Sequence, residues 1–478
     1  MDSFPAELVG KILSRMVRAR DIAVASVACR KWREAATSYI RKLSFDDLDW
    51  PKVIEKQDFA GVRELIIAET VMRTTCLKEL AIRCEYGKKS KMHAGMLTAC
   101  LLHVKHVLKS FTLTSPLMPN VNVFERLASD ASILEHLEWH HAYIPRVNRF
   151  VNGFPSLVSL ALDTVIDGLS AQHFVRILSL FPRLKHLSLK NLCVTEAPSK
   201  MELNICNLET LDIDCMMTEV SSVLVLHDNK LGRLCLYMKA MPSGRLHWRR
   251  KLEGNAESMQ ELRLVGVQVA EFTAGDCLGR LELDGVNIRV LEISKNNLQH
   301  LLIDESEIGQ LKVENMDSLR VLELLNSADF ENAWLRMYSK IICKAGLGLC
   351  RLTIQGSLPY KGLINLDAIC YAFPCLQALT MDYPNIYIVE SMVDPPCFEE
   401  MGNVVVNTVM LPENCVAFSE WIAELLQRCP NLRSVVIMLD VALTTEPFEN
   451  YDFIGELTSL LIPIVNPYPH INVTFEFA

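Results

Sequence analysis

Three histidines in one short segment come nearest to a metal-binding motif in this sequence. His136, His140 and His141 lie in LEHLEWHH, and imidazole is a common ligand of zinc and other transition metals. If residues 134–139 form a strand, His136 and His140 share a face but stand about 13 Å apart at ~3.3 Å per residue. One ion cannot bind both rings, so we expect core or surface histidines and no metal site.

Other residue patterns that could support catalysis or anion binding are weaker. The sequence contains no G-x-S-x-G, P-loop, H-E-x-x-H or glycine-rich dinucleotide motif, so we expect no enzyme activity and no cofactor. The densest basic segment, RLHWRRKL at 245–252, is expected to be an exposed loop, with binding of an anion or an acidic partner as the alternative. The segment GKKSK at 87–91 is a weak candidate for a nuclear import signal.

Cysteine usage and charge narrow the class of protein. The sixteen cysteines are scattered and no C-x-x-C pair occurs, which removes the usual zinc and redox signatures. We expect buried, reduced thiols in a cytoplasmic or nuclear protein. The net charge of −9 disfavours binding to nucleic acid or anionic membranes. No run of ~20 apolar residues predicts a membrane span, and the start, MDSFPAELVG, lacks the features of a signal peptide.

Most of the chain follows one repeated pattern, L-x-x-L-x-L. Five all-leucine copies start at residues 157, 184, 231, 278 and 319, against the ~1.4 copies that 68 leucines in 478 residues give by chance. With Ile, Val or Met allowed, further copies start at residues 208, 259, 298, 349, 376, 406 and 432. The mean spacing of 25 residues between 157 and 432 matches leucine-rich repeats, whose period is roughly 20–29 residues.

Each copy predicts a short strand whose leucines point to one side. One such unit cannot bury its apolar side alone, so neighbours must stack around a continuous core. Weaker trios extend the pattern backwards, starting at residues 134, 108, 77, 62 and 40. We therefore predict an α/β leucine-rich-repeat solenoid, a horseshoe with a parallel concave sheet of about 17 strands, from about residue 40 to a last strand at 471–477.

The segments between these strands are predicted from their lengths. Within residues 278–324 the triplets come too close together for a helix, so 288–293 and 308–313 are expected to be return strands on the convex side. Longer repeats have room for helices, with Ser170, Asp367 and Ser419 as expected N-caps. Apolar residues occupy the positions where an asparagine ladder would lie, so no such ladder is expected.

The first forty-five residues do not follow the repeat pattern and predict three short helices. Pro5 suits the first turn of a helix. The apolar face of that helix would consist of Leu8, Ile12, Leu13 and Met16. Asp21 is the expected N-cap of a second helix that begins at Ile22. The third helix is marked by a stripe at Trp32, Ala35, Ala36, Tyr39 and Ile40.

This segment resembles an F-box, whose pattern is roughly L-P-x-E-L-x-x-x-I-L-S-x-L…D-L…S-x-V-C-R-x-W-R. The matching positions are Pro5, Glu7, Leu8, Ile12, Leu13, Ser14, Asp21, Ser26, Val27, Cys29, Arg30, Trp32 and Arg33. Phe4, Met16 and Ile22 replace usual leucines but keep the apolar character, and residues 17–19 stand where a proline is frequent. With the repeats that follow, the chain resembles the plant-type F-box/leucine-rich-repeat (RNI-like) family.

The resemblance implies a non-catalytic, substrate-recognition subunit of an SCF-type ubiquitin ligase. Residues 1–45 would be the F-box, which binds a Skp-type adaptor that links it to a cullin scaffold. Residues 46–478 would form the repeat domain, which holds a protein target for ubiquitination. The expected adaptor-binding residues are Pro5, Leu8, Ile12, Leu13, Ile22, Val27, Cys29 and Trp32.

The target is expected on the concave face of the central and C-terminal repeats, away from the F-box end. Carboxylates gathered by the short coils would favour a basic partner segment. The expected target-binding residues are Arg233, Tyr237, Arg280, Glu282, Asp284, Asp304 and Glu323.

Two other classes of function stay open. One is a small-molecule (hormone) receptor, since some plant F-box repeat proteins bind a hormone, but those carry a strongly basic concave core around an inositol phosphate. The other is a repeat scaffold outside the ubiquitin system, against which only the F-box argues. The sequence does not name the target.

Overall fold

One strand per repeat, each parallel to the next, forms the framework of the protein in the computed structural model. The chain divides into two units, Met1–Gly254 and Asn255–Ala478. The structure describes residues 5–46, 60–83, 92–114, 123, 127, 132–140, 153–163, 180–194, 200–203, 207–217, 223–226, 231–240, 252–253, 258–274, 276–293, 297–313, 316–325, 345, 347–356, 364–383, 386–387, 396–409, 415–440 and 447–477.

The ladder of the first unit contains eight strands in the part of the chain that the structure describes. They are β1 (Lys42–Asp46), β2 (Glu79–Arg83), β3 (Ser110–Leu113), β4 (His136–His140), β5 (Ser159–Asp163), β6 (His186–Val194), β8 (Thr210–Met217) and β10 (Arg233–Ala240). Their register aligns equivalent repeat positions, so that Leu43 pairs with Leu80 and Leu187 pairs with Leu211. Leucines of successive repeats therefore stack into continuous inward rows.

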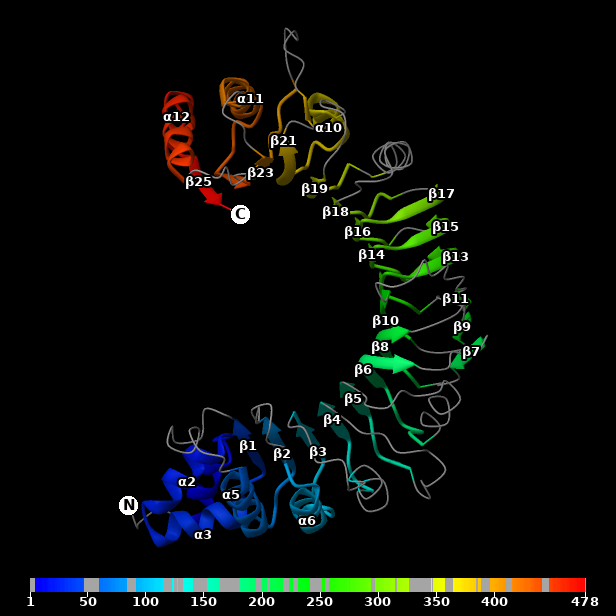
Figure 1. Ribbon diagram of the computed structural model, residues 1–478, viewed down its shortest axis with the longest axis vertical. Helices are drawn as coiled ribbons and strands as arrows, with labels where there is room; N and C mark the ends of the chain where they lie inside the picture. The colour runs from blue at the N-terminus through cyan, green and yellow to red at the C-terminus, as the bar shows by residue number, and fades with distance from the viewer. Residues whose placement is uncertain are drawn as a thin grey trace. The chain divides into compact units, whose positions relative to one another are not determined.

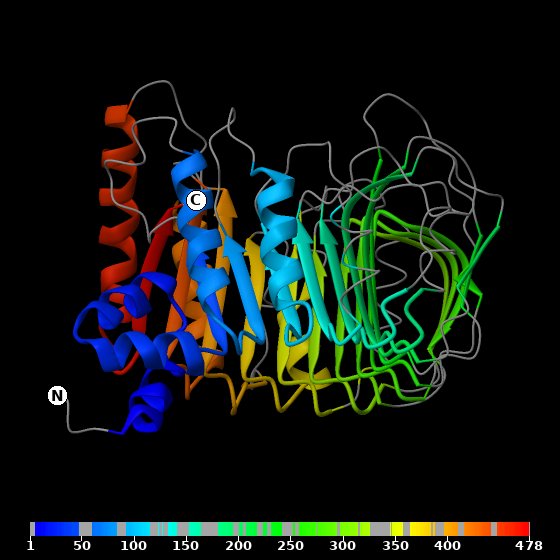
Figure 2. The ribbon, with the colours of Figure 1, turned by 90° about the horizontal axis from the view of Figure 1, so that it is seen from below.

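Helices cover the back of this ladder at its N-terminal end. Helices α5 (Ala60–Arg73) and α6 (Ala94–Val104) lie side by side behind the first strands (Figures 1 and 2). Later repeats of the first unit carry a short second parallel sheet instead, made of β7 (Lys200–Leu203), β9 (Val223–Leu226) and β11 (Leu252–Glu253).

The three predicted N-terminal helices are present. They are α1 (Ala6–Leu13), α2 (Ala19–Val27) and α3 (Arg30–Tyr39). The prediction that Asp21 caps the second helix is wrong, because α2 begins at Ala19 and Asp21 lies in its first turn. The backbone fixes this start: the Val17 carbonyl accepts from the Ser44 N–H at 2.9 Å, and Arg18 forms a bridge with Ser44.

The ladder of the second unit contains nine strands among the described residues. They are β12 (Glu261–Val265), β14 (Arg280–Asp284), β16 (His300–Asp304), β18 (Val321–Leu325), β19 (Arg351–Gln355), β21 (Ala378–Tyr383), β23 (Asn403–Val409), β24 (Ser434–Asp440) and β25 (Asn472–Phe477). The last of these is the strand predicted at 471–477. The two ladders together have the 17 strands that the repeat pattern predicts.

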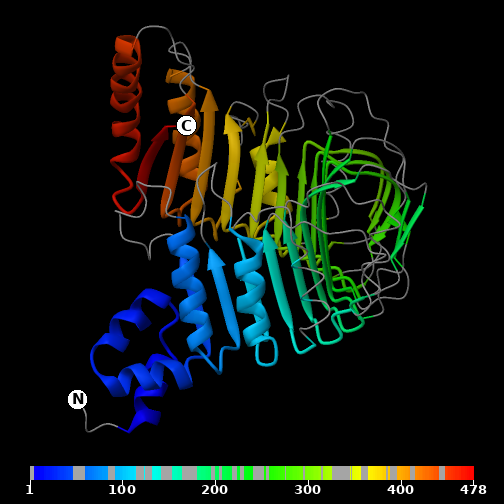
Figure 3. The same cartoon turned by 60° about the horizontal axis from the view of Figure 1, so that its bottom comes forward.

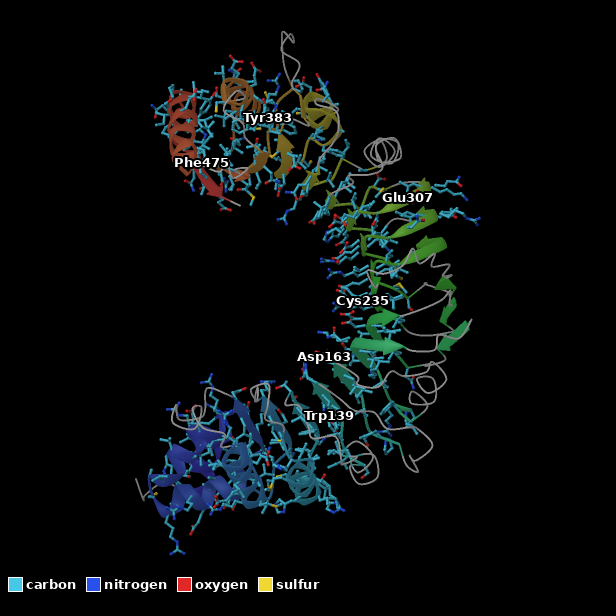
Figure 4. The ribbon with its side chains drawn as sticks, viewed as in Figure 1. Trp139, Asp163, Cys235, Glu307, Tyr383 and Phe475 are labelled. Carbon is cyan, nitrogen blue, oxygen red and sulfur yellow. The ribbon has the colours of Figure 1, made fainter. Side chains whose placement is uncertain are left out.

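Return strands occupy the back of the second unit where the repeats are short. The predicted ones at 288–293 and 308–313 are present as β15 (Asn287–Ile293) and β17 (Glu307–Val313). A third, β13 (Gln268–Ala274), was not predicted, and the three strands pair in parallel. Glu307 marks this back sheet in Figure 4. The inward residues Ile288 and Leu291 are fully buried, because they close each coil against the leucines of the ladder.

Longer repeats of the second unit carry helices α10 (Leu366–Ala372), α11 (Cys415–Arg428) and α12 (Pro447–Val465), and a two-stranded sheet, β20 (Ile364–Asn365) and β22 (Ile386–Tyr387). Two predicted N-caps are wrong. Asn365 caps α10 by accepting from the Asp367 N–H at 2.8 Å, so Asp367 lies inside the helix. Ser419 lies in the middle of α11 and donates to the Val416 carbonyl. The helix predicted after Ser170 lies outside the described residues.

The leucine trios form the core, with two exceptions. Side chains of the five all-leucine trios are at most 2% exposed. The trio predicted from Val62 is wrong, because Val62 and Leu65 lie in helix α5 and are exposed. The trio predicted from Val406 is out of register, since Met401, Val404 and Val406 are the buried set. Because Val or Met can replace leucine in the pattern, the sequence does not distinguish the register that starts at Met401 from the one that starts at Val406.

A turn residue with positive φ follows the ladder strand in several repeats. Such residues are Gly266 (62°), Gly285 (57°) and Glu305 (40°), and Asn191 (51°) has the same conformation at the register irregularity inside β6. Glycine and asparagine adopt this conformation with little strain, whereas Glu305 does so at a cost. The Gly285 N–H donates to the Asp304 carbonyl at 2.9 Å, and the Ser306 hydroxyl accepts from the Val286 N–H at 3.0 Å. These bonds satisfy turn groups that an asparagine ladder would otherwise serve.

A buried ion pair joins α10 to α11. The Arg428 guanidinium Nε lies 3.0 Å from Asp367 Oδ1, and both side chains are at most 3% exposed. Arg428 also donates through Nη1 to Glu424 Oε2 at 2.5 Å. Removing one partner of such a pair leaves an uncompensated buried charge, which costs far more than the intact pair contributes.

We predict that Arg428→Met destabilises the second unit by about 3–5 kcal/mol, because the Asp367 carboxylate loses its counter-charge. The double variant Arg428→Met with Asp367→Leu should recover much of this loss. Thermal and urea unfolding measure both effects. The control is Arg30→Met, which breaks the exposed Arg30–Glu34 pair and should change stability by less than ~0.5 kcal/mol. Equal effects of Arg428→Met and Arg30→Met would contradict the prediction.

Candidate partner-binding surfaces

The three N-terminal helices pack around a small apolar core. Val9, Leu13, Ile22, Ala35 and Ala36 are at most 8% exposed and form this core. Gly10 of α1 lies against the Tyr39 ring of α3, where an added Cβ would stand only 2.4 Å from the ring carbon Cγ. This close approach holds α1 on α3.

The outer side of these helices carries large apolar side chains. The exposed fractions are 43% for Leu8, 46% for Ile12, 69% for Val24 and 73% for Val27. Leu8 and Ile12 lie on α1, and Val24 and Val27 lie on α2. Large apolar side chains exposed in this way are frequent at sites of protein association. The N-terminal helices therefore offer an apolar docking surface, defined by Leu8, Ile12, Val24 and Val27.

The structure divides the predicted adaptor-binding residues into two groups. Pro5, Leu8, Ile12 and Val27 are exposed, whereas Leu13 and Ile22 are buried in the helix core. Leu13 and Ile22 thus support the surface and do not lie on it. Cys29 and Trp32 are partly exposed. Sequence reasoning missed Val24, which stands three residues before Val27 and so shares its side of α2.

A network around one histidine occupies the ladder face of the first unit. The ladder face is the surface formed by the side chains that alternate with the inward leucines. His140 Nδ1 lies 3.1 Å from Asp163 Oδ2, and its Nε2 lies 3.2 Å from Glu138 Oε1. Asn191 donates to Asp163 at 2.7 Å, and Thr112 donates to Glu138 at 3.2 Å. Figure 4 marks Asp163 at this face.

The structure places the histidines of β4 on the surface or partly buried, where His140 contacts two carboxylates. His136 and His140 lie at opposite ends of β4, and His140 uses both ring nitrogens toward carboxylates. Among the described residues no group of His, Cys, Asp and Glu side chains could hold a metal ion. His141 lies outside the described residues.

Carboxylates near the end of the first unit's ladder are only partly paired. Asp212 and Asp214 of β8 each have one buried carboxylate oxygen without a hydrogen-bond partner. Burial raises the pKa of Asp212, although the charges of Lys190 and Arg233 oppose this shift. The predicted target-binding residues Arg233 and Tyr237 follow on β10, where Arg233 is exposed and Tyr237 is half-buried.

The ladder face of the second unit begins with a compensated charge cluster. Glu282, predicted as a free acidic contact, is 7% exposed. Its carboxylate lies 3.1 Å from the Arg263 Nε on the neighbouring strand and also binds the Arg280 guanidinium. The single carboxylate of Glu282 offsets only one of the two guanidinium charges, so this cluster adds no negative charge to the face.

The carboxylates of Asp304 and Glu323 on this face have pKa values that are shifted in opposite directions. Asp304 pairs in register with Asp284 of the neighbouring strand. Burial is the main cause that raises the pKa of Asp304, and the negative charges of Asp284 and Glu305 raise it further. Glu323 lies 3.5 Å from His300 Nε2, and this histidine lowers the pKa of Glu323 despite partial burial. Asp284 and Asp304 thus form an acidic pair on neighbouring strands of this face.

The comparisons with known proteins agree with this architecture. No family model matches the chain. The Arabidopsis thaliana protein named F-box/LRR-repeat protein At1g67190 is 26% identical over 492 aligned residues, which cover 100% of both chains. The resemblance to the plant F-box/leucine-rich-repeat family is confirmed. The segment whose sequence resembles an F-box forms the three N-terminal helices, and the two ladders are the repeats.

Several features noted in the sequence fall outside the F-box and ladder surfaces. Of the basic segment 245–252 only Leu252 belongs to the described residues, and GKKSK at 87–91 is not among them. The eleven cysteines whose side chains the structure describes are free thiols; five of them are buried and three are exposed. Burial raises the pKa of Cys100 to about 11 and that of Cys429 to about 12.

Among the helices that the structure describes, none has the length and apolar character of a membrane-spanning segment.

We predict opposite pH-dependent effects for Asp304→Asn and Glu323→Gln. The raised pKa of Asp304 means that its charge opposes folding at neutral pH. Asp304→Asn should therefore raise the melting temperature at pH 7, and the gain should shrink as the pH falls through the raised pKa. The lowered pKa of Glu323 means that its charge favours folding above ~pH 4.3.

Glu323→Gln should accordingly lower the melting temperature at pH 7, and the loss should vanish as the pH falls through the lowered pKa of Glu323. Melting curves from pH 4 to pH 8 test both variants against the wild type. Shifts of the same sign at pH 7 would show that the two environments are not as described.

Proposed function

We propose that this F-box/leucine-rich-repeat protein is the non-catalytic substrate-recognition subunit of an SCF-type ubiquitin ligase. It binds a Skp-type adaptor, which links it to a cullin scaffold, and it acts in the cytoplasm or nucleus. The supporting observation is the exposed apolar surface of Leu8, Ile12, Val24 and Val27 on helices whose sequence resembles an F-box.

The physical argument for the adaptor rests on the small size of the three-helix unit. About forty residues bury too little apolar surface to be stable by a wide margin, yet this unit leaves six large apolar side chains exposed to water. A partner that covers them removes their contact with water, which favours association by ~25 cal/mol per Å² of apolar surface. The hydrogen bond from the Ser44 N–H to the Val17 carbonyl holds this surface on the first repeat.

For the target we propose the ladder face of the second unit at Asp284 and Asp304. These neighbouring carboxylates are not compensated in the way that Glu282 is compensated by Arg263 and Arg280. A basic segment of a partner would relieve the repulsion between them and would be steered toward them.

The charge cluster of Glu282, Arg263 and Arg280 also argues against the alternative function as a small-molecule receptor. A site for a polyanionic ligand needs several free cations, but Arg263 and Arg280 share Glu282, which offsets one of their two charges. Filling such a site would require these pairs to break and the carboxylate to be left near the anion.

We predict that Leu8→Lys with Val27→Lys abolishes adaptor binding without unfolding the chain. Both side chains are exposed, so the charges meet water in the free protein but would be buried in the complex, at a cost of ~2 kcal/mol or more per anchor. Isothermal titration with a purified Skp-type adaptor measures the effect. The control is Val416→Lys, at a 54% exposed residue of α11. Wild-type affinity of the Leu8 and Val27 variant would exclude the ubiquitin-ligase role.

We predict that Asp284→Lys with Asp304→Lys loses the protein target and keeps the adaptor. Proteins retained by the wild-type chain from plant extract are identified by mass spectrometry, and their retention by the variant is then compared. A milder pair, Asp284→Asn with Asp304→Asn, separates loss of charge from misfolding, and Glu476→Lys on the last strand is the matched control. Unchanged retention by both aspartate variants would move the target site elsewhere.

A further inference from the structure

The outward face of helix α5 is apolar, which is unusual for a helix at the surface of a repeat unit. Val62, Leu65, Ile66 and Met72 are between 38% and 59% exposed. They recur at helical spacing and so form one stripe along α5. A surface helix normally presents charged and polar residues to water, so this stripe marks a surface that a partner covers. We call it the α5 stripe.

The orientation of the stripe is fixed by the opposite face of the same helix. Ile67 and Val71 are buried there. Glu64 is also buried and accepts hydrogen bonds from the His93 N–H at 2.9 Å and from His93 Nδ1 at 2.8 Å. The helix cannot rotate to hide the stripe without breaking these contacts.

The polar residues along the stripe do not oppose an apolar partner. Glu69 lies among the four apolar residues, but its carboxylate pairs with Arg73 one turn later. This pair is exposed and leaves no net charge on the stripe. An incoming apolar surface can cover Leu65 and Met72 while Glu69 and Arg73 stay at the rim in water, which is the usual arrangement of an interface.

The stripe adjoins the F-box segment. The Thr75 N–H, just after α5, donates to the Thr37 carbonyl of α3 at 3.3 Å. Tyr39 at the end of α3 is 36% exposed and stands two residues from this bond. Figures 2 and 3 both show α5 beside the F-box helices.

Exposed apolar side chains are concentrated at this end of the first unit. Fifteen large apolar side chains are exposed among the described residues, and ten of them lie between residues 8 and 72. These ten belong to the F-box segment and α5 alone. A partner seated on the F-box segment therefore meets a second apolar surface within the same compact unit.

We infer that the adaptor surface extends from the F-box segment onto the α5 stripe. This inference rests on the proposed function, because the occupant is the same Skp-type adaptor. The adaptor would bury Leu65 and Met72 in addition to the F-box anchors. The first repeat thereby takes part in holding the adaptor and fixes its orientation on the repeats more firmly than three small helices alone.

The test is adaptor affinity of the full chain carrying Leu65→Lys with Met72→Lys. Lysine keeps helix propensity, and a lysine at position 65 lies one turn before Glu69, so helix α5 should persist. We expect at least a tenfold rise in the Kd measured by isothermal titration, with an unchanged melting temperature. Leu65→Ala with Met72→Ala should give a smaller rise in the same direction and guards against an effect of charge alone.

The matched control is Leu347→Lys with Val416→Lys, two residues of the second unit that are 67% and 54% exposed. This control should keep wild-type affinity. If the Leu8 and Val27 variant loses the adaptor while both α5 variants bind it as the wild type does, the stripe is not part of the adaptor surface and the proposed function still stands. If the Leu8 and Val27 variant binds normally, the proposed function fails and the inference falls with it.

A second copy of the chain is the competing occupant of the stripe. Light scattering of the wild type and of the Leu65 and Met72 variant tests it. A wild-type dimer that the variant loses, with adaptor affinity unchanged, would assign the stripe to self-association and overturn the inference.

Discussion

No single coil of this chain can bury its own apolar side, and the architecture follows from that constraint. Each repeat contributes one short strand and two or three inward leucines, and these find partners only in the coils before and after. The backbone register places Leu281 beside Leu301 and Leu301 beside Leu322. Stacking then makes one continuous core in each unit from pieces that would not fold singly. The ladder hydrogen bonds hold the spacing, and the leucine rows supply the stabilisation.

The same stacking decides what the ladder faces look like. Side chains between the inward leucines stand beside their equivalents on neighbouring strands, so charges separated by a whole repeat become neighbours. Lys42 pairs with Glu79 across one such step, and Arg263 reaches Glu282 across another. Most of these pairs are partly solvated and contribute little to stability. Their effect is to offset charges on the ladder faces, whereas Asp284 and Asp304 form an acidic pair on neighbouring strands.

A terminal coil of the stack has no neighbouring repeat on one side, so another part of the chain must cover its apolar side chains there. At the N-terminal end the three N-terminal helices provide that neighbour. Ile40 and Leu43 are buried there, and α2 is joined to β1 through the backbone of Val17 and Ser44. These helices therefore shield the first coil while presenting their own outer apolar side chains. Helix α5 also exposes apolar side chains.

The sequence by itself determined the repeat architecture, because a recurring apolar spacing of about 25 residues has few other physical solutions. It also located the three N-terminal helices, the return strands at 288–293 and 308–313, and the final strand. These features depend on local periodicity, which a sequence displays directly. The resemblance to an F-box came from side chains at fixed spacing and needed no tertiary information.

Only the tertiary structure decided which residues face outward and which charges meet. Leu8 and Leu13 look equivalent in the sequence, but packing of α1 on α3 exposes the first and buries the second. Glu282 and Asp284 are both acidic positions of one strand, yet arginines on β12 and β14 compensate the first. Val62 and Leu65 fit the repeat pattern and belong to a helix. The physical reason is common to all three cases: burial and pairing depend on neighbours that are distant in the chain.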